Sequence, residues 1–151
     1  VSSTSWMTTD IRIIHTSWQA HETEIRLIRQ RVFIDEQRVP EALEWEDHED
    51  SYHYILALDH QKQAIGTGRI DARGHIGRMA VMKNWRNQGV GSAILKALIE
   101  FAQNRHDPSV VLNAQTTAIG FYEKQGFIIC SDEFLDAGIP HRTMMRTLAG
   151  S

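Results

Sequence analysis

Residues 77–92 read GRMAVMKNWRNQGVGS, and this stretch decides the fold. Its apolar start predicts a strand over His75–Met82. The apolar spacing that follows predicts an amphipathic helix over Gly89–Asn104. The turn between them, Arg86–Gly91, has the form Arg-x-x-Gly-x-Gly. The start of a helix leaves backbone N–H groups without acceptors and carries a partial positive charge, so this turn is typical of an anion site.

Two common glycine-rich phosphate motifs do not fit this turn. A P-loop needs Gly-Lys-Ser/Thr at the start of the helix, but Gly91 is followed by Ser92-Ala93. The dinucleotide fingerprint needs a small residue where Ile94 stands, and it follows the first strand of its unit. The turn therefore suits a diphosphate outside the ATP and NAD patterns. The alternative is a helix start that only packs closely against its neighbours.

Outward from this unit, the chain predicts one mixed α/β domain. The first half reads as an antiparallel meander of strands with one helix before them. The second half alternates strands and helices, and its short apolar strand is expected to be buried on both faces. The expected strands are Asp10–Thr16, Tyr52–Asp59, Ala64–Ala72, His75–Met82, Ser109–Asn113, Phe127–Leu135 and His141–Leu148. The expected helices are Ala20–Phe33, Gly89–Asn104 and Thr116–Lys124.

A strongly acidic segment lies between the first helix and the meander. Asp35–Ser51 has no clean period and predicts a loop with at most a short helix, and six of the ten residues in Glu41–Asp50 are acidic. Such a run is most simply a solvated surface, although its charge could instead attract a cationic ligand. Arg69 and Arg78 are candidates to bind an anion or to pair with this segment.

Composition excludes several classes of protein. The net charge of −3 over 151 residues argues against a nucleic-acid surface or an anionic-lipid anchor, and no run approaches a membrane span. Cys130 is the single cysteine, so no internal disulfide forms, and a cytoplasmic setting is expected. The histidines lack zinc-site spacing, so no metal is expected. Residues 1–7 are expected to be a disordered tail or expression remnant, with the domain at residues 8–151.

The strand and glycine turn together resemble the acyl-CoA-binding motif of the GNAT N-acetyltransferases, over about Ile11 to Leu148. Four further segments resemble the ElaA/YjcF-like branch of that superfamily. They are Val32–Gln37 (VFIDEQ), Gly66–Arg69 (GTGR), Leu112–Gln115 (LNAQ) and Glu133–His141 (EFLDAGIPH). The last is long and unusual, which makes a chance match improbable.

This resemblance implies a fold and a site for the donor acetyl-CoA. The fold would be a single-domain, mostly antiparallel mixed sheet with helices on both faces and a splayed parallel strand pair. Backbone groups of the splayed strand would pair with pantetheine, the glycine turn would hold the pyrophosphate, and Arg86 would be a charge partner for phosphate. Asn113 would bond pantetheine or hold its loop, or would simply cap the next helix. The implied donor-site residues are Met79, Ala80, Val81, Arg86, Gln88, Gly89, Val90, Gly91, Ser92, Asn113 and Tyr122.

The resemblance also implies catalytic roles. Tyr122 matches the general acid that protonates the leaving thiolate, which is feasible because a thiol has a pKa near ~8.5 and tyrosine near ~10. Its alternative is an aromatic core pair with Phe121. His141 and Glu36 are site-lining candidates for the base, which stays unassigned. The acceptor would be a small-molecule or peptide amine acetylated directly in a ternary complex. A non-catalytic acyl-CoA sensor, an ATP-binding domain and a homodimer remain open.

Overall fold

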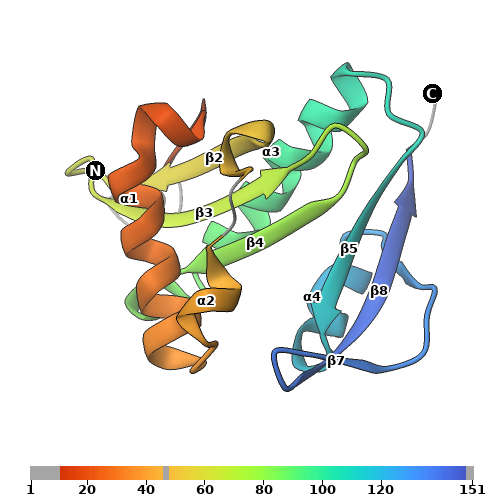
Figure 1. Cartoon of the computed structure of the whole chain (residues 1–151). Helices are drawn as coiled ribbons and strands as arrows, with labels where there is room; N and C mark the ends of the chain where they lie inside the picture. The colour runs from red at the N-terminus through yellow and green to blue at the C-terminus, as the bar shows by residue number, and fades with distance from the viewer. Residues whose placement is uncertain (1–10, 46–47, 149–151) are drawn as a thin grey trace.

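The computed structural model describes residues 11–45 and 48–148, so the expected tail at residues 1–7 lies outside the described part (Figure 1). Strands and helices follow in the predicted order, with short helical turns between them. They are β1 (Arg12–Thr16), α1 (Trp18–Arg29), the π-helical η1 (Gln30–Glu36), α2 (Glu41–Glu44), the 3₁₀ turn η2 (Glu49–Ser51), β2 (His53–Leu58), β3 (Ala64–Ile70), β4 (Ile76–Val81), the 3₁₀ turn η3 (Lys83–Trp85), α3 (Val90–Asn104), β5 (Ser109–Gln115), the 3₁₀ turn η4 (Thr116–Ala118), α4 (Ile119–Glu123), β6 (Ile128–Ile129), β7 (Phe134–Asp136) and β8 (Ile139–Thr147).

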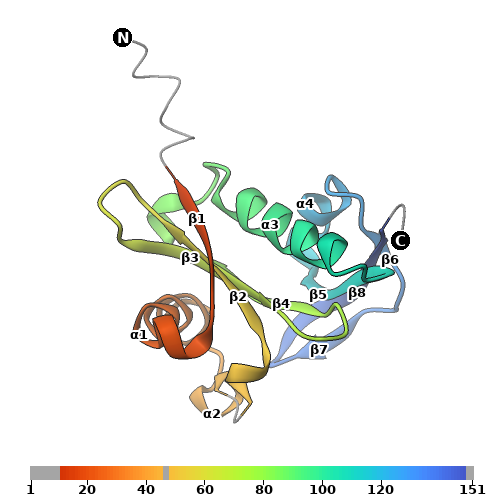
Figure 2. The ribbon, with the colours of Figure 1, turned by 90° about the horizontal axis from the view of Figure 1, so that it is seen from above.

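Strands β2, β3 and β4 form the predicted antiparallel meander, and β1 pairs with β2 at its edge, which gives the order β1-β2-β3-β4. Side chains alternate between its faces, as the pleat requires. On β2, Ile55 and Ala57 belong to the core beneath α3, whereas Tyr54 and Leu56 belong to the core beneath α1. Figure 2 shows the two helices on opposite faces of this sheet. The expectation of helices on both faces is therefore confirmed.

Two glycines of β3 let α3 lie close to the sheet. A Cβ added at Gly66 would be 2.8 Å from Cδ1 of Ile94, and one at Gly68 would be 3.0 Å from Cγ2 of the same side chain. Both distances are shorter than normal carbon contacts. These glycines therefore place the helix that begins at the glycine turn directly on the sheet.

A second antiparallel sheet has the order β5-β8-β6, with β7 paired to β8. Along β5, Val110, Leu112 and Ala114 are buried, while Asn113 is exposed. The expectation that this strand is buried on both faces is therefore wrong. Its second face opens toward a cavity instead of a packed layer.

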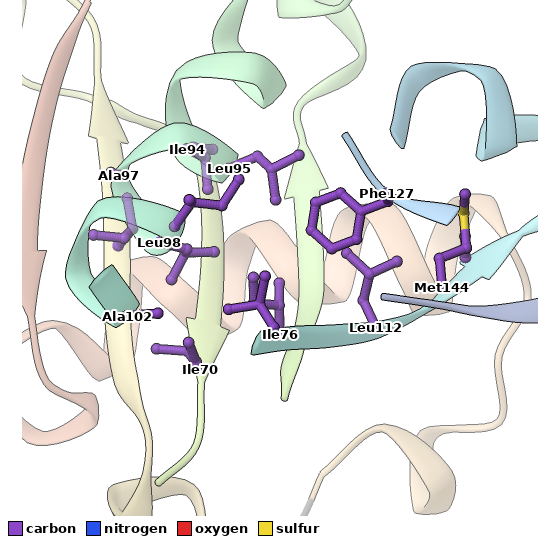
Figure 3. Close-up of a cluster of buried hydrophobic side chains, with 14 of the residues drawn as sticks. Ile70, Ile76, Ile94, Leu95, Ala97, Leu98, Ala102, Leu112, Phe127 and Met144 are labelled. Carbon is purple, nitrogen blue, oxygen red and sulfur yellow. The ribbon is translucent and has the colours of Figure 1, made fainter. Parts of the chain in front are cut away.

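The two sheets touch at one end and then separate. The parallel strands β4 and β5 meet at a single bridge, His75 with Val111, where the Val111 N–H donates to the carbonyl of Gly74 at 2.9 Å. Figure 1 shows the strands running apart from this contact, which is the expected splay. One core nevertheless spans both sheets under α3, because Ile76, Leu95 and Leu98 belong to the same cluster as Leu112 and Phe127 (Figure 3).

Several predicted boundaries were wrong. The first helix begins earlier, because the Ser17 hydroxyl caps it by accepting from the Ala20 N–H at 3.2 Å, and η1 prolongs it beyond Phe33 to Glu36. The single strand expected over Phe127–Leu135 is two short strands, β6 and β7, with an irregular segment between them. Ser131 explains part of that break, since its hydroxyl accepts from the Thr143 N–H of β8 at 2.8 Å.

Candidate functional site

A cavity of about 400 Å³ lies where β4 and β5 diverge. Its walls come from seven elements, η1, β4, β5, η4, α4, β7 and β8, which contribute both apolar and polar groups. The lining residues that the sequence singled out as site candidates are Met79, Ala80, Val81, Arg86, Asn113, Tyr122 and His141. Residues that lie up to 62 positions apart (79 to 141) are thus brought to one opening by the splay.

The open edge of β4 supplies backbone groups to this cavity. Ala80 is paired with Thr67 of β3, and the Met82 N–H donates to the Ile65 carbonyl at 2.8 Å. Because hydrogen-bonding direction alternates along an antiparallel strand, Met79 and Val81 turn their N–H and C=O groups away from β3. The Val81 carbonyl already accepts from Nε of Arg86 at 3.0 Å. The groups left for an amide-bearing ligand are those of Met79 and the Val81 N–H.

The glycine turn leaves space around the first residues of α3. Gly89 adopts φ +85°, a left-handed conformation that favours glycine, and a Cβ there would meet nothing within 4 Å. At Gly91 a Cβ would make only ordinary contacts, 3.6 Å to Phe121 and 3.7 Å to Val81. The first bond within the helix joins the Ala93 N–H to the Gly89 carbonyl at 3.0 Å. Close packing therefore explains neither glycine. The left-handed backbone explains Gly89, and the space beside Gly91 is compatible with an anion close to the first N–H groups of α3.

Arg86 and Glu36 form a two-pronged ion pair beside the cavity. The guanidinium donates to the two carboxylate oxygens at 2.5 and 2.7 Å. This hydrogen bonding lowers the pKa of Glu36 and raises that of Arg86. Glu36 itself lines another cavity of about 670 Å³, which shares Val32 with the first. The structure thus connects Glu36 to the splayed site through Arg86 and does not place it in the same cavity as Tyr122 and His141.

Tyr122 is packed among aromatic rings and also lines the cavity. Its ring packs edge-on against Phe121 and Phe127, with centroid distances of 5.0 and 6.0 Å. The side chain also lines the cavity, and its hydroxyl lies 3.9 Å from the Met79 sulfur. Burial raises the pKa of Tyr122 to about 12, so the phenol holds its proton at neutral pH. A packed ring with a protonated hydroxyl at a cavity is suited to donating a hydrogen bond, and the raised pKa makes it a weaker proton donor than a free tyrosine.

His141 lies near the start of β8 and is 8% exposed. Its Nδ1 is 2.6 Å from the Ile139 carbonyl, and the ring stacks on Phe134. A carbonyl oxygen only accepts hydrogen bonds, so Nδ1 carries the hydrogen. In the neutral ring, the lone pair is therefore on Nε2, which makes this a side chain of fixed tautomer on the cavity wall.

Asn113 does not cap a helix, so that alternative was wrong. β5 continues to Gln115, and the helical turns that follow begin after Gln115 and Ala118. The Asn113 side chain instead faces the cavity and accepts a hydrogen bond from the Thr143 hydroxyl at 2.8 Å. Asn113 thus lies on the cavity wall formed by β5, and the expected pantetheine contact stays a prediction.

The acidic segment is held by a buried arginine. Arg29 of α1 donates to Glu44 at 2.6 Å and to Glu49 at 2.9 and 3.0 Å, and all three residues are buried. Arg69 donates to Glu49 at 2.6 Å, and Arg78 is 3.5 Å from Glu44. The interpretation of this segment as a solvated surface is therefore wrong for Glu44 and Glu49. Both arginines pair with the acidic segment, one of the two alternatives considered for them.

Three polar residues of the cavity were not singled out from the sequence. Gln37 and Gln115 join η1 to β5 across the opening, with Nε2 of Gln115 donating to Oε1 of Gln37 at 2.9 Å. Asp136, at the end of β7, lines the same cavity. All three stand in the segments that carry the family resemblance, which was the available signal.

Within residues 11–45 and 48–148, no group of three or more His, Cys, Asp or Glu side chains could hold a metal ion. In the same part of the chain, every helix is too short or too polar to cross a bilayer. These findings concern the described residues alone.

Known proteins are similar to this chain in sequence and in fold. A family model described as an acetyltransferase (GNAT) domain matches residues 17–148. The uncharacterized N-acetyltransferase YjcF of Bacillus subtilis is 42% identical over 123 residues, which cover 79% of this chain and 87% of YjcF. A crystal structure from Lactobacillus plantarum has a TM-score of 0.84 at 24% identity, covering 91% of this chain and 98% of that one. Escherichia coli ElaA has a TM-score of 0.77 at 23% identity, covering 90% and 99%.

Proposed function

The chain belongs to the GNAT acetyltransferase family, in the branch of YjcF and ElaA, and we propose that it transfers an acetyl group from acetyl-CoA directly to a primary amine. Membership makes it an acyl-CoA-dependent acyltransferase. The finer proposal is carried by one observation, which is that a protonated Tyr122 and a tautomer-fixed His141 line the same cavity at the splay.

Donor binding would use backbone groups rather than charged side chains. The open amides of the glycine turn would accept the pyrophosphate, and the free edge of β4 at Met79 and Val81 would pair with pantetheine as an added strand does. Arg86 is engaged by Glu36, so its contribution to phosphate binding would require that pair to rearrange. This arrangement would place the thioester between the diverging strands.

Transfer requires three linked events. The amine nitrogen attacks the thioester carbonyl, the C–S bond breaks, and one proton moves from nitrogen to a base while sulfur gains one. The Tyr122 hydroxyl would supply the sulfur proton or bond the thiolate, and Nε2 of His141 would accept the amine proton, directly or through water. Cys130 is exposed and lies outside the residues that line the cavity, which favours direct transfer over an acyl-enzyme.

The proposal is tested by release of free CoA thiol. The chain is mixed with acetyl-CoA and a panel of small amines and peptides, and thiol is measured against enzyme-free and amine-free controls. We expect amine-dependent release with at least one acceptor. Binding of acetyl-CoA without release above background for any amine would instead favour a non-catalytic sensor.

Tyr122→Phe separates an enzyme from a sensor more sharply. Removing the hydroxyl should lower kcat about a hundredfold, since general acids contribute on that order, while the acetyl-CoA Kd stays the same. Tyr52→Phe is the matched control, because Tyr52 lies outside the cavity and is not proposed to touch either substrate. An unchanged kcat in Tyr122→Phe would remove this residue from the mechanism.

A further inference from the structure

Arg78 occupies an unusual backbone position on the wall of the cavity. It lies on β4 with φ +49°, where the register with β3 shifts between Thr67 and Arg69. A positive φ is uncommon for a residue other than glycine and costs free energy. The side chain is 28% exposed and lines both the 400 Å³ cavity and a smaller cavity of about 60 Å³ beside it.

The guanidinium of Arg78 is only loosely held by the protein. Its Nη2 is 3.3 Å from the Leu43 carbonyl, and its buried Nε, which is 3.5 Å from Glu44, makes no hydrogen bond within the described part of the chain. Glu44 has a much closer partner, Arg29, at 2.6 Å. The role of neutralising Glu44 therefore falls mainly to Arg29, and Arg78 keeps donors for another anion.

The opposite wall of both cavities carries the complementary charge. Asp136 and His141 line the two cavities together with Arg78. Asp136 forms no ion pair with any of the described residues. Nε2 of His141 is an acceptor, as its Nδ1 is bonded to Ile139. Between the walls, the Gln37–Gln115 pair is polar and uncharged.

We propose that the acceptor is a primary amine that also bears a carboxylate, as an amino acid does, and that Arg78 binds this carboxylate. The amine then lies on the Asp136 and His141 side, where a carboxylate favours the arriving ammonium and an imidazole nitrogen takes its proton. This inference rests on the proposed function, because it names the substrate class of that same site.

A carboxylate fits Arg78 better than a neutral or a cationic group does. The guanidinium fork matches its two oxygens in plane, and a charge-assisted bond of this kind is stronger than a neutral one. The smaller cavity has room for a group of that size. A purely cationic acceptor would face Arg78 at close range, which is unfavourable.

Amino acids and their carboxamides form the natural test pairs, since the two differ only in the anionic group. We expect kcat/KM, calculated per neutral amine at saturating acetyl-CoA, to be about tenfold or more higher for the acid of at least one pair. Arg78→Gln should abolish this preference and Arg78→Lys should restore part of it. Arg12→Gln, at an exposed position on β1, is the matched control and should retain it.

Two results would overturn the inference while leaving the proposed function intact. One is that the wild type uses carboxamides as well as acids in every pair. The other is that Arg78→Gln keeps the acid preference. If no amine causes thiol release, the proposed function fails. The carboxylate inference is then tested by ligand binding. In the CoA-bound chain, amino acids should raise Tm more than their amides do, and Arg78→Gln should lose this difference. An equal effect of acids and amides would refute the inference.

Discussion

At the scale of single residues, the two candidates for the general base, Glu36 and His141, differ in the hydrogen bonds that they already accept. Glu36 accepts two hydrogen bonds from Arg86, which lower its pKa and make it a weak proton acceptor. His141 presents Nε2 on the cavity wall. We therefore expect His141→Gln to lower kcat about a hundredfold and Glu36→Gln to leave it nearly unchanged. Steady-state rates at fixed acetyl-CoA measure both values of kcat. A large loss in Glu36→Gln with little loss in His141→Gln would instead identify Glu36 as the base.

Sequence alone could not make that distinction. Both residues were selected because they lie in segments that resemble the family, and the resemblance says nothing of their partners. Arg86 is 50 positions from Glu36, and the pairing depends on η1 and the turn after β4 coming together in space. For Tyr122, in contrast, the sequence offered an aromatic core pair or a general acid as alternatives, and the structure shows the packed ring on the wall of the cavity.

At the scale of elements, the first turn of α3 permits a test of why Gly91 is glycine. The protein leaves ordinary contact distances for a methyl group there, so Gly91→Ala should keep or raise the free energy of unfolding, by up to about 1 kcal/mol. A methyl group would still obstruct a pyrophosphate on the amides, so the acetyl-CoA Kd should rise about tenfold or more. Gly120→Ala, in α4 with open space, is the control; calorimetry and urea unfolding measure both quantities. An unchanged Kd in Gly91→Ala would favour a purely structural glycine.

The segment from α2 to η2 is held by buried charge, which predicts a pH dependence of stability. Burial alone would raise the pKa of Glu49, but hydrogen bonds from Arg29 and Tyr54 outweigh it and lower the pKa from 4.5 to about 2. A carboxyl whose pKa is depressed in the folded state stabilises the fold above its unfolded pKa and loses that contribution as pH falls toward the folded value. Urea unfolding between pH 5 and about 2 should therefore show a steeper loss of stability in the wild type than in Glu49→Gln. Parallel curves would contradict this origin.

The charge pattern of Glu41–Asp50 explains why the sequence predicted a solvated surface. Six acidic residues in ten look solvated, because a buried carboxylate is costly unless it is paired. Arg29 lies on the apolar face of α1, where a single basic residue within an amphipathic pattern gives no sign of burial. The helices and strands with clean periods, such as β2 and α3, were predicted almost to the residue. The segments without one, Asp35–Ser51 and Phe127–Leu135, depend on tertiary partners.

At the scale of the whole molecule, the splay means that two sheets share a core under α3 but have open facing edges beyond the His75–Val111 bridge. A ligand that pairs with β4 and contacts β5 should therefore act on both sheets at once. We expect acetyl-CoA at a hundred times its Kd to stabilise the chain by about 2.7 kcal/mol, and ATP at the same concentration to do much less. Hydrogen exchange should slow at Met79 and Val81, whose N–H groups face the opening, and not at Ala80, which already pairs with β3. Slowing confined to the glycine turn, or equal stabilisation by ATP, would show a phosphate site without pantetheine recognition. The acyl-CoA specificity would then have to arise elsewhere than in the divergence of the sheets.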